Sequence, residues 1–185
     1  MKQFTGFAIL LFSVFFICCG SSSPDSDNNI SNSNADSGST SDMTFSCKIN
    51  GELWEPSSGK YMIQAQQVFN DTENALTVMG IKGMNENDGV MERFHLKVFR
   101  VSEPGEHEAL MYCGLTRMGT RDGAVISDNF SAQPGTGLVK ITAYDRTAKR
   151  VSGTFSFKMK HNKSGEVVTV TEGEFSNVLI EEQRM

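Results

Sequence analysis

From Met43 onward the chain consists of short runs in which apolar and polar residues alternate, separated by turns that contain glycine. The clearest run covers residues 150–159, RVSGTFSFKM, where every second residue from Val151 to Met159 is apolar or glycine. Successive side chains of a β-strand point to opposite faces, so a period of two indicates a strand with one buried face. Apolar spacing of the helical kind is not sustained over three turns anywhere. The sequence therefore predicts an all-β domain.

The turns between these runs are short. Asn50-Gly51 follows the first run and is typical of a hairpin turn, because both residues tolerate a positive φ. Short connections of this kind favour an antiparallel β-sandwich or barrel, here of about nine strands over residues 43–182. The candidate strands lie within residues 44–49, 61–69, 75–81, 91–101, 110–113, 124–130, 137–144, 150–159, 167–171 and 174–180, and Leu53 and Trp54 follow the first turn without an assignment.

Residues 1–18 have the arrangement of a secretory signal peptide: Lys2, then an apolar run over residues 4–17. That run is shorter than the roughly 20 apolar residues of a membrane-spanning helix, and no basic cluster follows it. The segment Phe16-Ile17-Cys18-Cys19 resembles a lipobox, in which a small residue precedes the lipidated cysteine. We expect residues 1–18 to be removed and Cys19 to carry the lipid anchor, with palmitate among its acyl chains. Cys18 is the alternative, although bulky Ile17 would then precede the cleavage.

Residues 19–42 continue the chain with almost nothing but Ser, Asn, Asp and Gly after Cys19. Such a segment buries too little apolar surface to offset the entropy of ordering, so the sequence predicts a disordered tether. Its expected end-to-end distance is on the order of 25 Å. The anchor and the tether together predict a domain held at a membrane of the bacterial cell envelope. The outer membrane is the expected location, and the sequence does not distinguish its periplasmic face from its surface face.

The two ends of the β-rich region resemble a known class of proteins. The opening TFSCKINGELWEP and the closing GLVKITAYDRTAKRVSGTFSFKM and VTVTEGEFSNV are similar to Bacteroidota lipoproteins that carry one all-β domain of unknown function. The matching positions are turn and core residues. The resemblance therefore implies a fold and a location, and it implies no catalytic residue.

The charge of the chain argues against nucleic acid as a partner. The formal net charge is −5, and removal of residues 1–18, where Lys2 is the single charge, makes it −6. Binding to nucleic acid needs a basic face. The mild acidity is typical of a soluble surface.

Cys47 and Cys113 are the cysteines of the β-rich region, and they leave two alternatives open. Outside the cytoplasm they can form one disulfide, whereas two separate buried thiols would act as small apolar side chains. The chain contains no Cys-x-x-Cys or His-x-x-x-His spacing, so we expect no zinc site, and no other motif indicates a metal or a cofactor.

Motifs for catalysis are incomplete. His107-Glu108 begins like His-Glu-x-x-His, but Met111 stands where the second histidine belongs, so we expect a solvated loop. The alternative is a functional histidine whose basicity is raised by the flanking Glu106 and Glu108. Residues 85–89 resemble a calcium loop without its first and last carboxylates, which favours a hairpin turn. No Gly-x-Ser-x-Gly elbow occurs. The sequence names no catalytic residue.

Exposed aromatic side chains can stack on sugar rings. The candidates are Trp54, Tyr61, Tyr112 and Tyr144, with a core position as the alternative for Trp54. We expect a non-catalytic binding module for an unidentified ligand or envelope partner, with a glycan as one candidate. The alternative is a structural or assembly component of an envelope complex, and a third hypothesis is a hydrolase that uses paired carboxylates.

Overall fold

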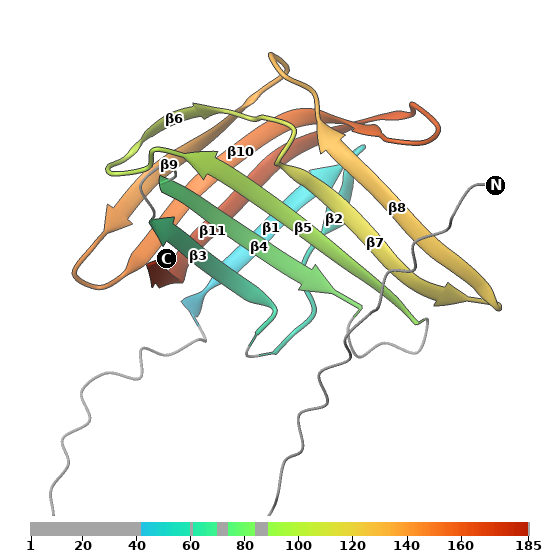
Figure 1. Ribbon diagram of the computed structural model, residues 1–185, viewed down its shortest axis with the longest axis horizontal. Helices are drawn as coiled ribbons and strands as arrows, with labels where there is room; N and C mark the ends of the chain where they lie inside the picture. The colour runs from blue at the N-terminus through green and yellow to red at the C-terminus, as the bar shows by residue number, and fades with distance from the viewer. Residues whose placement is uncertain (1–41, 60, 70–73, 84–88, 185) are drawn as a thin grey trace, which may run out of the picture. The chain divides into compact units, whose positions relative to one another are not determined.

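The computed structural model describes residues 42–59, 61–69, 74–83 and 89–184 (Figure 1). Eleven strands lie in these residues and form one hydrogen-bonded sheet, which confirms the all-β class predicted from the sequence. No helix within these ranges is long and apolar enough to cross a membrane. The strands are β1 (Thr44–Ile49), β2 (Glu52–Trp54), β3 (Ile63–Phe69), β4 (Asn74–Lys82), β5 (Val90–Phe99), β6 (Gly105–Glu108), β7 (Gly114–Arg121), β8 (Ala124–Ala132), β9 (Leu138–Asp145), β10 (Arg150–His161) and β11 (Val167–Arg184).

The sheet folds over into two layers that face each other across the core (Figure 1). One layer has the order β3-β4-β5-β7-β8, and the other has the order β2-β1-β11-β10-β9-β6. Two corners join the layers, because the end of β11 pairs with β3 and the end of β10 pairs with β8. The fold is therefore a sandwich whose two corners are closed by backbone hydrogen bonds, as in a flattened barrel.

The pairing of β11 with β3 departs from the expected antiparallel arrangement. Residues Ile180–Arg184 run parallel to Ala65–Phe69, while the other pairings between described strands are antiparallel. The expected strands at 167–171 and 174–180 are one strand, β11, which shifts register against both β1 and β10. Because β11 is long and irregular, it can pair with β1 and then with β3 along the same edge.

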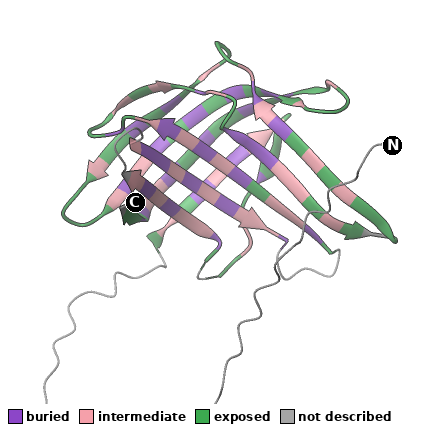
Figure 2. Ribbon diagram, viewed as in Figure 1, coloured by how far each residue is buried: buried purple, intermediate pink, exposed green. Residues whose placement is uncertain are grey.

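Aromatic rings from both layers meet in the core. Phe94 of β5 lies 5.8 Å from Phe45 of β1 and 5.5 Å from Phe155 of β10, measured between ring centroids. Each fully buried ring contributes roughly 1.5–3 kcal/mol through removal of apolar surface from water. Figure 2 shows the resulting alternation of buried and exposed residues along the strands, which β10 follows over most of its length.

Strands β2, β6 and β7 were not predicted, and one predicted strand is wrong. Residues 110–113 form a turn in which the Cys113 N–H donates to the Leu110 carbonyl at 2.8 Å. The missed strands β6 and β7 flank this turn.

The predicted signal peptide, tether and lipidated Cys19 or Cys18 lie outside the described residues, as do residues 84–88 of the calcium-like loop.

Candidate functional site

A pocket of about 420 Å³ lies between the two layers. Its walls come from the turn between β1 and β2, from β2 itself, from inward-facing residues of β4, β5, β7 and β8, and from residues 166–168 at the start of β11. The lining is mainly polar, which is unusual for space inside a β-sandwich. The polar side chains in it therefore need an explanation.

Three of the polar lining residues, Lys82, Glu92 and Arg117, belong to a row of charged residues that ends at Asp128 outside the lining. We call these four residues the charged row. They belong to β4, β5, β7 and β8 in turn, and each lies directly opposite the next across the sheet. Each member stands two residues from a buried position on its own strand, namely Gly80, Phe94, Leu115 and Phe130. Positions two apart on a strand share a face, so the charged row extends the core face of this layer. Its charges alternate in sign across the four strands.

Both carboxylate oxygens of Glu92, a lining residue of the pocket, accept hydrogen bonds. One of its carboxylate oxygens, Oε2, accepts a hydrogen bond from Trp54 Nε1 at 2.7 Å. The other, Oε1, accepts from Arg117 Nε, also at 2.7 Å. The Glu92 side chain is 20% exposed and that of Arg117 is 38% exposed, so both retain access to the solvent in the pocket. The guanidinium carbon of Arg117 also lies 5.6 Å from the centroid of Phe130.

Trp54 combines the two roles that the sequence left open. Its ring is 4% exposed and packs edge-to-face on Phe45 at 5.9 Å, as the core alternative requires. The same residue lines the pocket, where its indole N–H is bonded to Glu92. A ligand in the pocket would therefore contact the edge of Trp54 and would not find an open ring face to stack on.

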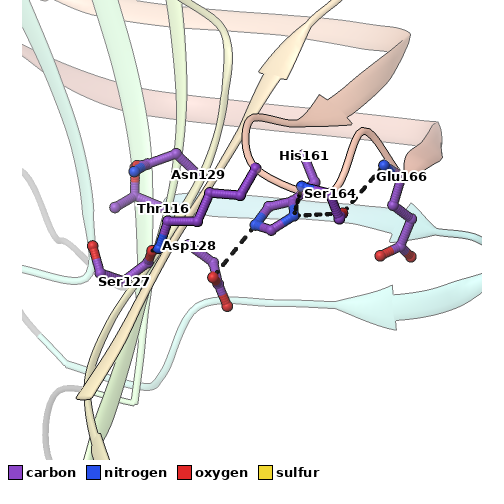
Figure 3. Close-up of polar contacts among 8 residues, drawn as sticks. Thr116, Ser127, Asp128, Asn129, His161, Ser164 and Glu166 are labelled. Atoms are coloured by element: carbon purple, nitrogen blue, oxygen red, sulfur yellow. Dashed lines mark hydrogen bonds and ion pairs between the residues drawn. The ribbon is translucent and has the colours of Figure 1, made fainter.

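The charged row continues to a histidine at the end of β10, drawn in Figure 3. His161 Nε2 lies 3.3 Å from Asp128 Oδ1, a distance for an ion pair but without the geometry of a hydrogen bond. On the other side of the ring, His161 Nδ1 lies 2.6 Å from Ser164 Oγ. The His161 ring packs on Phe130 with 4.8 Å between centroids, so it lies next to the pocket wall.

Ser164, His161 and Asp128 are the residue types of a hydrolase triad. However, Ser164 and His161 accept hydrogen bonds from backbone N–H groups of the turn in which they lie. The backbone N–H groups of residues 164, 165 and 166 donate to His161 Nδ1, the His161 carbonyl and Ser164 Oγ respectively. A serine nucleophile needs nearby N–H groups that are free to stabilise an oxyanion. These three are occupied, so the cluster holds the turn between β10 and β11 in place.

The three predicted tyrosines do not line the pocket. Tyr61 and Tyr112 are exposed, and Tyr112 packs edge-to-face on Phe99 at 5.5 Å, with Lys97 Nζ 5.7 Å from its centroid. Tyr144 is half-buried, and its hydroxyl donates to Oε1 of the fully buried Gln67. The prediction of a surface aromatic at Tyr144 is wrong because β9 shifts register against β10 near this residue, which turns Tyr144 inward and Ala143 outward.

Cys47 and Cys113 are free and buried, so of the two alternatives the structure has separate thiols. Burial raises the pKa of the Cys47 thiol to about 12. Burial also raises the pKa of Cys113 to about 11, partly offset by hydrogen bonds with the backbone at Lys97 and Leu110. Both side chains act as small apolar groups in the core.

His107 lies on strand β6, paired with Val139 of β9, and not in the solvated loop that the sequence indicated. Burial lowers the pKa of His107, so the alternative in which the neighbouring glutamates raise its basicity is wrong. Those glutamates bond elsewhere: Glu106 pairs with Lys140 at 3.2 Å, and Glu108 accepts from the Gly135 N–H at 2.7 Å. In the parts of the chain that the structure describes, no three His, Cys, Asp or Glu residues are placed to hold a metal ion.

Glu92 and Arg117 were not predicted as pocket residues, yet the sequence contains a signal for Glu92. Glu92 falls on the same alternating face as Phe94, Leu96 and Val98, which are all buried. A charged residue at an inward position of a strand marks either a pairing partner or a polar cavity. Arg117 gave no such signal, because β7 itself was not recognised.

The fold and the pocket define a two-layered all-β domain with a polar cavity between the layers. Comparison with protein families places it further: residues 41–179 match the family described as Domain of unknown function (DUF6252), and the chain belongs to this family. The match begins just before β1 and ends within β11, so it covers the sandwich almost completely. No curated protein and no solved structure matches the chain.

Proposed function

We propose that this protein is a lipid-anchored lipoprotein of the bacterial cell envelope, of the Bacteroidota type, whose β domain binds a small polar ligand in the pocket between its layers. The carrying observation is the bonded set of Trp54, Glu92 and Arg117 in a cavity of about 420 Å³. Pockets for small ligands commonly begin at roughly 300 Å³ and hold a few well-placed polar groups. The proposal is non-catalytic, because the polar groups of the site are engaged in positioning one another.

Prior positioning of these groups supports binding. Glu92 holds the Arg117 side chain through Nε and is itself held by Trp54, so the polar groups stand in place before a ligand enters. A ligand then needs to order few side chains, each of which would otherwise cost roughly 0.5–1.5 kcal/mol on binding. The anchor and the tether support a role at the membrane surface, where ligands of the envelope are presented.

The anchor is tested by mass spectrometry of the N-terminal peptide of the protein purified from a bacterial membrane. We expect a chain that begins at Cys19 and carries the added mass of a diacyl or triacyl group. A chain that begins at Cys18 would correct the modified residue. A mature N-terminus without lipid would overturn the anchored location.

The pocket is tested by thermal unfolding of the full chain with three panels of small molecules: neutral sugars, free amino acids and organic anions. A ligand that binds only the folded state raises stability by about 2.7 kcal/mol at a hundred times its Kd. We expect stabilisation by members of one panel, lost in Arg117→Gln and retained in Glu106→Gln, whose ion pair lies on β6 and β9 outside the pocket. If no panel raises the midpoint, the binding role is wrong and the structural or assembly role becomes the better hypothesis.

A further inference from the structure

We infer that the pocket accepts one unit of a neutral saccharide, an inference that rests on the proposed binding function and names its ligand class. The first argument is charge. Three carboxylates, Glu52, Glu92 and Glu166, and two cations, Lys82 and Arg117, line the pocket, which gives it a net charge of −1. An anionic ligand would be repelled by the three carboxylates, and a cationic ligand would be repelled by Lys82 and Arg117. A neutral ligand avoids both repulsions.

The second argument is the order of donors and acceptors. Along the charged row a donor on β4, Lys82, is followed by an acceptor on β5, Glu92, and then by a donor on β7, Arg117. Neighbouring strands lie about 4.8 Å apart, so donors and acceptors alternate over a distance comparable to a sugar ring. A hydroxyl group both donates and accepts, so a ring carrying several hydroxyls meets lysine, carboxylate and guanidinium with the same chemical group. Ligands with only donors or only acceptors cannot match this order.

The third argument is the balance of polar and apolar surface. Leu115, Phe130 and Val168 line the pocket beside the charged groups, and Phe130 lies under the Arg117 guanidinium. A saccharide ring presents C–H groups on its faces and hydroxyls around its rim, so it can meet both the apolar and the polar residues of this lining. A volume of about 420 Å³ is near the lower end for small-ligand pockets and suits one ring or two.

The chain supplies its own reporter for this inference. Trp54 is its single tryptophan, and it lies in the pocket wall with its indole N–H bonded to Glu92. Its emission therefore reports on this site alone. The full chain is titrated with methyl glycosides of glucose, galactose, mannose and N-acetylglucosamine, and in parallel with glucuronate, N-acetylneuraminate and alanine.

The expected result is a saturable change in Trp54 emission with at least one neutral glycoside and none with the anions glucuronate and N-acetylneuraminate or with zwitterionic alanine. Arg117→Gln removes a charged donor and should weaken that glycoside about tenfold or more. Lys82→Gln serves as a second pocket variant because Lys82 has no part in the Glu92 bonds and its replacement should leave folding intact. Glu106→Gln should bind like the parent chain, and circular dichroism confirms the β fold of each variant.

Each outcome separates the two proposals. Saturable binding of glucuronate, N-acetylneuraminate or alanine, with no neutral glycoside bound, overturns the saccharide class and leaves the binding function standing. Neutral glycosides that bind the folded Arg117→Gln and Lys82→Gln variants as tightly as the parent overturn the placement of the sugar in this pocket. If no compound changes the emission and none raises the unfolding midpoint, both proposals are wrong.

Discussion

Glu92 is a charged residue in a position that the alternation of β5 assigns to the interior. A buried carboxylate is costly unless it is paired and hydrogen-bonded. Glu92 meets both conditions, because Arg117 supplies the opposite charge and Trp54 supplies a second donor. A cheaper solution for stability alone would be an apolar residue in the same place. The presence of a paired charge beside a mainly polar pocket therefore favours a role in recognition.

Tyr144, in contrast to Glu92, is a polar residue whose hydrogen bond stabilises the fold. Its hydroxyl donates to Gln67, whose side-chain amide donates to Asn74 Oδ1 at 3.0 Å and to the Val101 carbonyl at 3.1 Å. Tyr144→Phe leaves the buried Gln67 oxygen without this donor and should lower the free energy of unfolding by about 1–3 kcal/mol. Urea denaturation measures the change. The exposed Tyr112→Phe is the matched control and should stay within about 0.5 kcal/mol, so equal effects of the two variants would contradict the buried network.

The thiols of Cys47 and Cys113 should be inert in the folded protein. The thiolate is the reactive form, and pKa values of about 12 and 11 keep its population very small at pH 8. We expect iodoacetamide at pH 8 to leave both residues unmodified until urea unfolds the chain, after which both should be alkylated. Peptide mass mapping reads the two sites separately. Rapid labelling of the folded chain would show that the thiols are accessible. A disulfide-linked peptide that contains both cysteines would show that they are not separate thiols.

At the scale of elements, prediction succeeds where one face is apolar and fails where it is not. β1 and β10 alternate between apolar and polar residues along most of their length, so their positions could be read directly. β7 has Leu115, Arg117 and Gly119 on its inward face, and this face lacks the apolar pattern. The strand was missed because it lines the pocket. Polar residues at inward positions break the apolar alternation by which a strand is recognised, so such strands are commonly missed.

Register shifts explain the remaining differences between sequence and structure. Alternation assigns Ala143 to the core, but the irregular pairing of β9 with β10 exposes Ala143 and turns Tyr144 inward. β11 was divided at residues 172–173 for the same reason, since Glu172 has a φ of 51° and the pairing shifts nearby. A β-bulge adds one residue to a strand, and no characteristic residue type marks the bulges of this chain in the sequence. Its position depends on packing against a partner strand that is distant in sequence.

One pair of strands relies on glycine opposite phenylalanine. Gly173 of β11 lies directly across from Phe155 of β10, and a Cβ atom on Gly173 would stand 2.5 Å from the Phe155 ring and from its backbone oxygen. Gly173→Ala should therefore destabilise the fold by about 2–3 kcal/mol through overpacking. Gly105→Ala is the control, because its nearest neighbour, His107 Nε2, is 3.9 Å away. Thermal or urea unfolding that ranks the two variants equally would show that β10 and β11 can separate at little cost.

At the scale of the whole domain, closure of the corners leaves few free edges. The strands β11, β3, β4, β5, β7, β8 and β10 form a closed ring of pairings, with β1 and β9 attached to it. Within the described part of the chain, the sheet ends at β2 and β6, which have three and four residues. Short edges with charged residues, here Glu52, Glu106 and Glu108, resist pairing with another chain.

Two histidines connect the fold to pH. Burial, with a further contribution from the positive charge of Arg93, lowers the pKa of His95 below its ordinary value, and burial alone lowers the pKa of His107. His95 Nδ1 and His107 Nε2 are buried without a partner in good hydrogen-bond geometry among the described residues, and a weaker backbone interaction with Arg93 opposes the lowering of the His95 pKa only in part. Both rings are therefore held neutral in the folded state at a pH where the unfolded chain would already take up protons.

The sign of the resulting pH dependence follows from which state binds more protons. Below the ordinary histidine pKa of about 6.5 the unfolded chain binds more, so folding should lose stability as pH falls from about 7 toward the lowered pKa values of the folded state. Urea midpoints measured between pH 7.5 and pH 5 should decrease along this range. The double variant His95→Gln, His107→Gln should show a shallower decrease, while its midpoint at pH 7.5 fixes the cost of the replacements themselves. An identical slope in the parent and the double variant would mean that other groups, and not these two buried rings, carry the acid sensitivity of the domain.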